Sequence, residues 1–324
     1  MPTESATTYY GLPMLKESVW TADIPLYYYC GGAAGAAMTL GAALQLAHRR
    51  GNRKEMRRLS ASCHWIGIIG STAGAAFLIH DLGRPARFLY MLRVFRPTSP
   101  MSMGAWILAG AAPSAIATGL FMNRRGVAGT IGEFSGYVAG LFGAALAGYT
   151  GVLVSNTVLP IWREAGRWLP ALFIGSAATT AASLLDLFYE DEAARRVTRV
   201  FGTAGRVAEI VAARKVERLA SATPEVGKPF HSGAPSTLWK AAGVLTVASL
   251  ILALAPSKSG RSQRAAGLLG AAGSLGLRFA IHYLGNASAR DPRAAIRQQR
   301  SGMREDSEPA VVSEGALAES LLPR

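Results

Sequence analysis

Long segments with almost no charge recur along this chain, and they restrict its fold more than any other feature. Seven such segments contain 18 to 29 residues each, and they span residues 24–47, 59–79, 98–123, 134–162, 168–185, 237–257 and 265–289. A helix that crosses a bilayer needs about 20 mostly apolar residues. Half of the 324 residues are hydrophobic and only 17% are charged, which is less charge than a soluble domain carries. We therefore predict an all-α, polytopic membrane bundle.

An eighth segment, residues 197–213, is ambiguous. It carries Arg199, Arg206 and Glu209 among apolar residues. It can lie in the membrane interface as an amphipathic helix, or it can cross with its charges facing the protein interior. Arg206 and Glu209 are three positions apart, so they can pair on one face of a helix. Periodicity alone leaves both possibilities open.

Basic residues give conflicting indications of topology. The formal net charge is +14, but the arginines flank apolar runs and form no aromatic-laced patch, so we do not expect nucleic acid as a partner. The first loop, residues 48–58, holds six Lys and Arg residues. Because the first helix usually dominates, this loop should be cytoplasmic and the N-terminus outside. Five arginines between residues 290 and 304 favour a cytoplasmic C-terminus, which requires an odd number of crossings.

Composition divides the chain into three parts. Residues 1–23 are polar and lack the short apolar core of a cleaved signal peptide, so we expect an extramembrane segment and insertion directed by the first helix. Residues 24–289 form the membrane domain. Residues 290–324 are polar, and we expect a mostly disordered tail.

Ionisable and aromatic residues gather at the ends of the first four spans. With the N-terminus outside, the starts of spans one and three and the ends of spans two and four meet at the outer face. The candidate site residues at this face are Asp23, Tyr27, His80, Asp81, Arg84 and Tyr149. Charges at the edge of hydrocarbon are costly, which makes such residues candidates for binding a polar headgroup and exchanging protons. The structural alternative is an ion pair of Asp81 with Arg84 or Arg87, and aromatic interface anchors.

We expect no haem, no iron–sulfur cluster and no metal site in this chain. Cys30 and Cys63 lie in apolar segments without a Cys-x-x-Cys motif, so packing roles are expected. His64 and His80 are 16 residues apart on one span, about 24 Å along a helix, and cannot bind one haem. His64 and His282 are possible partners, but no second histidine pair supports a haem.

Four polar residues lie deep in the later spans: Asp186, Glu209, Arg278 and His282. Intramembrane acids and their neighbours can form a proton path. An arginine–carboxylate pair that ties helices together explains the charged residues equally well. Both interpretations remain open.

Several short motifs spread over nearly the whole chain combine glycine, proline and charged residues. They begin with Tyr-Tyr-Gly-Leu-Pro at 9–13, Trp20, Asp-Ile-Pro at 23–25 and Gly-Gly-Ala-Ala-Gly at 31–35. The most specific are Asp-Leu-Gly-Arg-Pro-Ala-Arg-Phe at 81–88 and Thr-Ser-Pro-Met-Ser-Met-Gly-Ala-Trp at 98–106. Pro-Ile-Trp at 160–162, Leu-Pro at 169–170 and Gly-Asn-Ala-Ser-Ala-Arg-Asp-Pro at 285–292 follow. Together they resemble the NrfD family of polysulfide reductase and nitrite reductase membrane subunits.

The resemblance implies a membrane subunit of a respiratory oxidoreductase in the bacterial cytoplasmic membrane. Members of this family form eight or more helices in two four-helix bundles, which favours eight spans with residues 197–213 as the sixth. They bind menaquinone or ubiquinone near the outer face and exchange electrons with a four-cluster, ferredoxin-like iron–sulfur protein. That protein serves a molybdopterin or multihaem cytochrome subunit, and some members contribute to proton translocation.

Site residues follow from the same resemblance. Asp23 falls where family members place quinone-contacting polar residues. Polysulfide reductase subunits carry a histidine a few positions further on, whereas this chain has Pro25, Leu26 and Tyr27 there. His80 or Tyr27 would then serve as the proton exchanger.

The loop between spans two and three is the expected docking surface. Its arginines, which include Arg87, Arg93 and Arg96, suit an acidic face of the iron–sulfur partner.

Two other functions are compatible with the sequence. A transporter or channel should have broken helices at the midplane and matched halves; Pro113 and Pro170 can break helices, but no matched halves are visible. A pure anchor would assemble with its partners without quinone chemistry. The sequence leaves undetermined the catalytic partner, the quinone type, the direction of electron flow and proton pumping.

Overall fold

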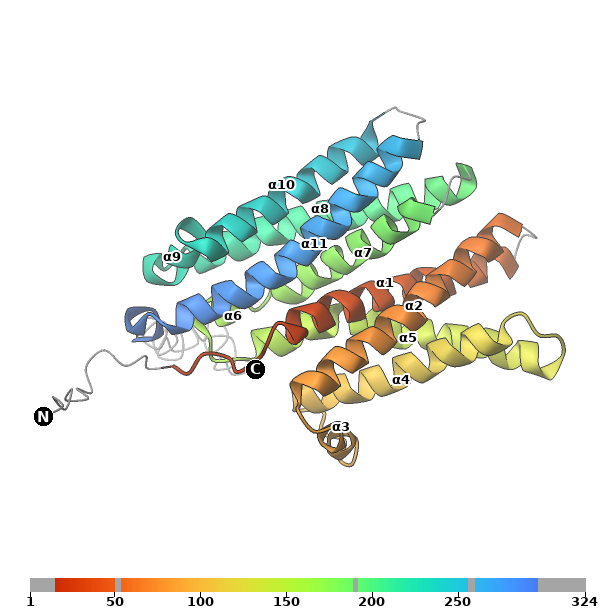
Figure 1. Ribbon diagram of the computed structural model, residues 1–324, viewed down its shortest axis with the longest axis horizontal. Coiled ribbons are helices and arrows are strands. Elements are labelled where there is room, and N and C mark those ends of the chain that lie inside the picture. The colour runs from red at the N-terminus through yellow and green to blue at the C-terminus, as the bar shows by residue number, and fades with distance from the viewer. Residues whose placement is uncertain (1–14, 50–53, 189–191, 256–259, 297–324) are drawn as a thin grey trace, which may run out of the picture.

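Helices make up the described part of this chain. The computed structural model describes residues 15–49, 54–188, 192–255 and 260–296, and within these ranges there are eleven numbered helices, a further short helical stretch at 292–296 and no strand. Eight helices are long: α1 (Asp23–Arg49), α2 (Lys54–Asp81), α4 (Pro100–Phe121), α5 (Val127–Ser155), α7 (Leu169–Phe188), α8 (Glu192–Ala220), α10 (Ala234–Leu254) and α11 (Gly260–Ala289). Figure 1 shows them running in roughly one direction. The predicted all-α, polytopic bundle is confirmed.

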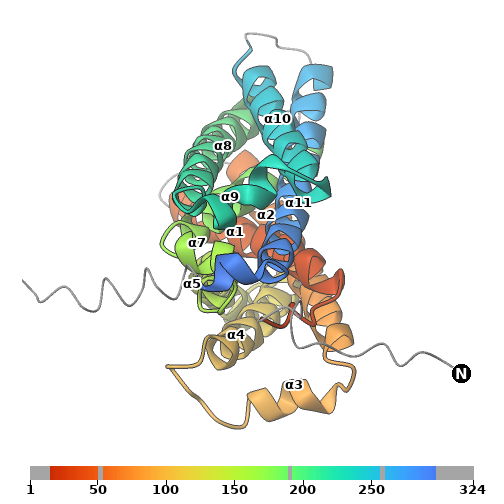
Figure 2. The same ribbon diagram turned by 90° about the vertical axis from the view of Figure 1, so that its left-hand side faces the viewer.

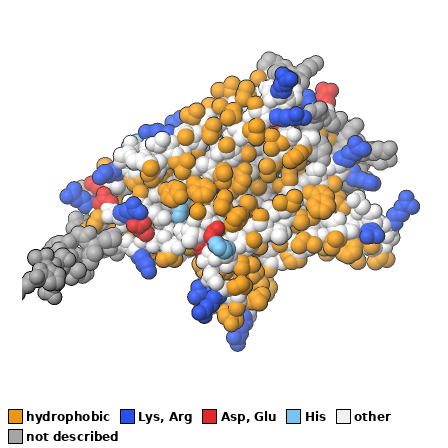
Figure 3. All heavy atoms as spheres, in the orientation of Figure 1, with side chains coloured by type: hydrophobic (Ala, Val, Ile, Leu, Met, Phe, Trp, Pro, Cys, Tyr) orange, Lys and Arg blue, Asp and Glu red, His pale blue; other side chains and the backbone are white. Residues whose placement is uncertain are grey.

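Six of the long helices are long and apolar enough to cross a membrane: α1, α2, α4, α5, α7 and α10. The molecule is a multi-pass membrane protein, and Figure 3 shows a broad hydrophobic band across one face with basic side chains toward the ends. The sequence predicts seven clear spans, one more than the six helices that meet this requirement of length and apolar composition. The additional one is α11, in which Arg261, Arg264 and Arg278 lower the mean hydropathy.

Residues 197–213, which the sequence leaves ambiguous, lie within helix α8. It contains 29 residues and packs against α7 and α10 inside the bundle. Arg206 and Glu209 are 0% and 2% exposed, so these two charges face protein, whereas Arg199 is exposed. An amphipathic helix lying in the interface would leave these charges in water. Residues 197–213 therefore belong to a helix that runs through the bundle.

The long helices form two four-helix bundles. In the first, α1 packs against α2 and α5, and α4 packs against α2 and α5; in the second, α7 packs against α8 and α11, and α10 packs against α8 and α11. The bundles meet where α7 contacts α1 and α5 and where α11 contacts α1. The second bundle lies above the first in Figure 1. This contact surrounds the start of α1 with residues from both bundles.

Glycines at two contacts bring helix backbones close together. At Gly35 of α1, a Cβ atom would collide with backbone atoms of Gly143 and Ala147 on α5. At Gly205 of α8, it would collide with the backbone of Thr179 on α7. Small residues permit such approaches in lipid, where packing replaces apolar burial as the source of association.

The described chain begins and ends on the same side of the bundle. Arg290, after α11, forms an ion pair with Glu17, before α1, with Nε 2.7 Å from Oε1. The Ser18 hydroxyl donates to the side-chain oxygen of Asn286 at 2.7 Å. We call this side the entry end, and the number of crossings is even. The odd number favoured by the C-terminal arginines is wrong, because positive charge determines topology least after the early helices.

The segment after α11 packs onto the bundle as far as the structure describes it. Ala294 and Ala295 are buried, so the first residues of the expected tail are folded. Residues 297–324 lie outside the described part, as do the motif at 9–13 and residues 50–53 of the first loop.

The fourth span ends earlier than the sequence predicts. The apolar run at 134–162 is not one helix, because α5 ends at Ser155 and a separate helix, α6 (Pro160–Glu164), follows. Pro160 occupies the start of α6, where its missing N–H is tolerated; within a continuous helix it would break the hydrogen-bond ladder. The break places Trp162 in the core, fully buried.

Candidate functional site

Hydrogen bonds link the polar residues at the entry end. The backbone N–H of Thr21 donates to Oδ1 of Asp81 at 3.0 Å. The Thr21 hydroxyl lies 2.8 Å from that oxygen and 2.9 Å from Oδ2 of Asp23, and Nδ1 of His80 lies 2.8 Å from the same Asp23 oxygen. One hydroxyl proton can serve only one carboxylate at a time. The ends of α1 and α2 thus bring Asp23, His80 and Asp81 together through Thr21.

A cavity of about 50 Å³ lies beside these residues. The residues that line it are Trp20, Ile24, Tyr27, Tyr28, Leu78, Asp81, Leu82, Met91, Met101, Ala105, Tyr149 and Leu153. Three of the candidate residues, Tyr27, Asp81 and Tyr149, are among them. Asp23, His80 and Arg84 are not, and the His80 side chain is 81% exposed. The candidate set therefore separates into a cavity group and a surface group.

One buried tyrosine hydroxyl faces this region without a partner. Tyr27 and Tyr28 are 1% and 0% exposed; the Tyr28 Oη forms no hydrogen bond with the residues that the structure describes, whereas the Tyr27 hydroxyl lies beside that of Tyr149. Nδ1 of His282 on α11 is also buried and unpartnered there, while its Nε2 lies 3.3 Å from Nδ2 of Asn286. Buried polar groups normally have partners, and exceptions call for an explanation such as a ligand.

An aromatic wall from α6 and α7 supports the cavity. Trp20 stacks on Trp162 with ring centroids 5.7 Å apart, and Nε1 of Trp162 donates to the Ile281 carbonyl at 2.9 Å. Tyr28 packs edge-on against Phe173 of α7. These contacts fix the α1 start, and with it the cavity, against α6, α7 and α11.

The segment between α2 and α4 stands away from the bundle. It contains the short helix α3 (Ala86–Met91), which projects at one edge of the molecule in Figure 2. The exposed arginines of this segment are Arg84, Arg87, Arg93 and Arg96. Tyr90 and Phe95 are also more than half exposed. The segment therefore presents a basic and aromatic surface.

The alternative ion pair at this loop does not form in the described residues. Asp81 accepts its hydrogen bonds from Thr21, and Nη1 of Arg87 donates to the Leu82 carbonyl at 2.8 Å. The Asp81 carboxylate is thus oriented toward the start of α1 and the cavity, while the Arg87 guanidinium is held by a backbone carbonyl.

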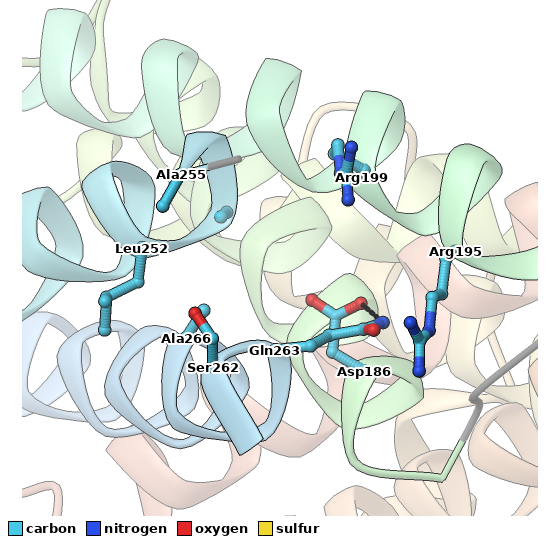
Figure 4. A pocket seen from close by; sticks show the side chains of 9 residues that line it. Asp186, Arg195, Arg199, Leu252, Ala255, Ser262, Gln263 and Ala266 are labelled. Carbon is cyan, nitrogen blue, oxygen red and sulfur yellow. Dashed lines mark hydrogen bonds between the residues drawn. The ribbon is translucent and has the colours of Figure 1, made fainter. Parts of the chain in front are cut away.

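A second polar cluster lies at the opposite end of the second bundle. Nη2 of Arg206 lies 3.6 Å from Oδ2 of Asp186, and its Nε donates to the Ser249 hydroxyl at 2.7 Å. Gln263 donates to Oδ1 of Asp186 at 3.0 Å. Figure 4 shows Asp186 and Gln263 beside Arg195 at a small pocket of about 30 Å³. Arg206 therefore pairs with Asp186, and not with Glu209 as its spacing allowed.

Glu209 and Arg278 lie between the two polar ends. The hydroxyl of Ser274 donates to Oε2 of Glu209 at 3.2 Å, and that of Thr246 to Oε1 at 3.4 Å. Nη2 of Arg278 donates to the Phe173 carbonyl at 2.9 Å, and the guanidinium lies 3.9 Å from the centroid of that ring. Arg278 also lies beside Gly32 of α1, one turn from Tyr28. Buried polar groups thus occur at successive depths from Asp186 to the start of α1.

A comparison with protein families decides the affiliation. A model of the polysulphide reductase NrfD family matches residues 12–208, more than half of the chain. The chain belongs to the NrfD family. It is accordingly a membrane subunit of a respiratory oxidoreductase, in a family whose members assemble with iron–sulfur and catalytic subunits. A search of curated proteins finds no match.

The NrfD match covers the whole first bundle and the entry-end cavity. It ends at residue 208, so Glu209 and helices α10 and α11 lie beyond it. The membership of the NrfD family that the short motifs predicted is confirmed. The roles of individual residues are argued from the geometry of the structure.

Sequence reasoning missed several residues of this NrfD site. Thr21 looks like an ordinary polar residue before a helix, and Tyr28 like one of three adjacent tyrosines. Trp162 seemed to end a membrane span. A signal existed for Trp162, because Pro160 marks a helix start, but nothing local indicates that its ring reaches Trp20.

Proposed function

We propose that this chain is the quinone-reactive subunit of its complex and exchanges electrons between the quinone pool and an iron–sulfur partner. The observation that carries the proposal is the entry-end cavity, where the Asp81 carboxylate, the unpartnered Tyr28 hydroxyl and the adjacent hydroxyls of Tyr27 and Tyr149 lie among apolar side chains. A quinone ring is flat and apolar and carries two oxygens. It needs apolar walls with a few convergent polar groups, and these residues fit that need.

Two methionines provide a route by which the cavity enlarges. The volume of about 50 Å³ accommodates only the end of a ring, and Met91 and Met101 form part of the wall. Met101 is 48% exposed, on the side of α4. Because methionine side chains are flexible, their rotation would admit a quinone, either menaquinone or ubiquinone, from the lipid.

The linked carboxylates supply a proton route. Oxidation of a quinol releases two protons and two electrons. In this proposal Asp81 accepts the two protons at the cavity one after the other, the Thr21 hydroxyl passes each to Asp23, and the exposed His80 exchanges it with water, while both electrons leave to the iron–sulfur partner. Tyr27 and Tyr28 orient the ring by donating hydrogen bonds, and Tyr149 closes the cavity. Reduction of a quinone uses the same groups in the opposite direction.

The projecting segment around α3 is the proposed docking surface. Arg87, Arg93 and Arg96 are exposed and suit an acidic face of a four-cluster, ferredoxin-like partner. Met91 belongs to α3 and also lines the cavity, so a partner seated on this segment lies close to the bound ring. That partner would serve a molybdopterin or multihaem cytochrome subunit at the outer face of a bacterial cytoplasmic membrane.

Quinol oxidation by the assembled complex tests the proposal. We expect Asp81→Asn and His80→Ala to lower turnover, with the larger loss, about 100-fold, in Asp81→Asn, because it removes the base next to the ring. Tyr28→Phe should weaken quinol binding without loss of assembly. Asp291→Asn is the matched control, since Asp291 lies at the entry end but does not line the cavity. Unchanged turnover in both Asp81→Asn and His80→Ala would overturn the site.

The buried charges of the second bundle support a second proposed activity, proton transfer across the membrane. The carrying observation is the series Asp186, Arg206, Glu209 and Arg278, which extends from the pocket in Figure 4 to the start of α1. Glu209 is held by hydroxyl groups, which can both donate and accept hydrogen bonds. His282, with an unpartnered Nδ1, continues the series on α11.

The ratio of protons moved to electrons transferred tests this second activity. In proteoliposomes that contain the assembled complex, Glu209→Gln should lower the ratio while quinol oxidation continues. Glu192→Gln, at the exposed start of the same helix, is the control. An unchanged ratio in Glu209→Gln would assign Glu209 to packing alone.

A further inference from the structure

A large groove lies on the outside of the second bundle, between α8 and α10. Its volume is about 560 Å³, against about 50 Å³ for the entry-end cavity. In Figure 2, α8 and α10 occupy the opposite edge of the molecule from α3. The groove therefore shares no surface with the proposed docking segment, and its function is independent of the quinone proposal.

Two cations lie at the same depth in this groove. Arg214 is six residues before the end of α8 at Ala220, and Lys240 is six residues after the start of α10 at Ala234. At 1.5 Å per residue, both lie about 9 Å inside the entry end of their helices. Neither has an ion-pair partner within the described ranges, and Glu217 accepts a hydrogen bond from Nε1 of Trp239 at 3.2 Å. The groove thus carries an excess positive charge near one membrane surface.

Below the cations the groove becomes apolar. Gly243, Val244, Val247 and Ile251 line it from α10, and they extend over about 12 Å of helix. Val244 and Ile251 are 67% and 64% exposed. A Cβ atom added at Gly243 would meet no atom within 4 Å, so the missing side chain leaves open space in the groove.

We propose that this groove binds an anionic phospholipid. The phosphate lies between Arg214 and Lys240, and one acyl chain runs along Gly243, Val247 and Ile251 toward the bilayer centre. Basic pockets between membrane helices favour anionic headgroups, and long basic side chains reach the headgroup level from within the hydrocarbon edge. The combination of charge at one depth and an apolar channel beneath it fits the two parts of a phospholipid.

Lipid retention by the purified complex tests the proposal. The complex is reconstituted in mixed micelles with phosphatidylglycerol or phosphatidylcholine, and bound lipid is quantified by mass spectrometry. We expect wild type to prefer phosphatidylglycerol, and Arg214→Gln with Lys240→Gln to lose roughly fivefold in affinity for each cation removed. Arg218→Gln, one turn away on α8 and outside the groove lining, should have no such effect.

Gly243→Leu provides a second test that does not depend on charge. The added Cβ atom meets open space and the larger side chain extends into the groove, so it should reduce retention of both lipids while the melting temperature stays near that of wild type. Equal retention of phosphatidylglycerol by wild type, the double variant and Gly243→Leu would overturn the proposal. Loss of a partner subunit in Gly243→Leu, with lipid retention unchanged, would also overturn it and assign the groove to a subunit interface.

Discussion

The two polar regions of this molecule hold their charges in opposite ways. At the entry end, Asp23, Asp81 and His80 lie near water and are joined by one threonine. In the second bundle, Asp186, Arg206 and Glu209 are buried and held by an ion pair and by hydroxyl groups. Water can solvate the first group in either protonation state. The second group depends on fixed protein partners, because an unpaired charge there is far more costly.

This difference predicts which property of the protein a substitution in each region impairs. Loss of a partner in the second bundle leaves a charge without solvent and should damage folding. Loss of a partner at the entry end leaves a charge that water can solvate and should damage chemistry instead. Substitutions in the two regions therefore test this difference, because those in the second bundle should lower stability and those at the entry end should lower turnover.

The largest expected effect belongs to Arg206→Ala. It removes the buried cation that pairs with Asp186, which costs about 3–5 kcal/mol, and the assembled complex should show a large drop in melting temperature or yield. The double variant Arg206→Met with Asp186→Asn removes both charges and should recover much of the loss. If Arg206→Ala is as stable as wild type, the buried pair does not support the bundle.

The second-largest effect is expected for a substitution at a close contact between helix backbones. Gly35→Ala forces a methyl group against the backbone of α5 and should cost about 1–3 kcal/mol. Gly243→Ala is the matched control, because its methyl group meets open space and replacing a helical glycine there is neutral or stabilising by up to about 1 kcal/mol. Thermal unfolding of both variants measures the difference. Equal melting temperatures would show that the α1–α5 contact adjusts freely.

A smaller effect is expected for Thr21→Val at the entry end. It removes the hydroxyl between Asp81 and Asp23 and should slow quinol oxidation about fivefold, equivalent to one hydrogen bond of roughly 1 kcal/mol. Thr21→Ser keeps the hydroxyl and should retain turnover. The dependence of turnover on pH should change in Thr21→Val only. Identical pH profiles for the two variants would exclude a relay through this residue.

The smallest effect concerns the ion pair that joins the chain ends. The hydrogen bond from Arg290, together with its positive charge, lowers the pKa of Glu17 below its ordinary value of 4.5. A carboxyl whose pKa is lower in the folded state stabilises it above the unfolded pKa, and this contribution disappears as the pH falls below 4.5 through the folded value. Because the pair is exposed, we expect less than about 1 kcal/mol.

Protease sensitivity of the segment before α1 measures this effect. Between pH 6 and pH 3 the segment should become more sensitive in wild type, whereas Glu17→Gln should be equally sensitive at both values. A wild type that is indifferent to pH would show that Ser18 and Asn286 hold the segment unaided.

Much of the fold was predictable because membrane helices are recognisable by length and polarity. The predicted spans were wrong or ambiguous where the polarity of a segment does not match its structure. Residues 134–162 are apolar throughout, yet Pro160 begins a new helix. The segment at 197–213 is charged, yet it runs inside the bundle because Arg206 and Glu209 find partners on other helices. Neither the start of α6 nor those partners can be read from local composition.

The candidate site was predictable in part for the same reason. Because successive helices alternate in direction, the start of α1 and the end of α2 lie on one side, which is why Asp23, His80 and Asp81 meet. This alternation does not determine which side chains line a cavity. Tyr28 and Trp20 do so because they pack against Phe173 of α7 and Trp162 of α6, respectively.

The sequence by itself determined the kind of solvent this protein meets and the family to which it belongs, since apolar length and short motifs are local properties of the chain. The tertiary structure alone decided that the crossings are even in number, that Arg206 pairs with Asp186, and that Thr21 joins two carboxylates. Each of these is a contact between residues far apart in the chain, and such contacts follow from how helices pack and not from the residues beside them.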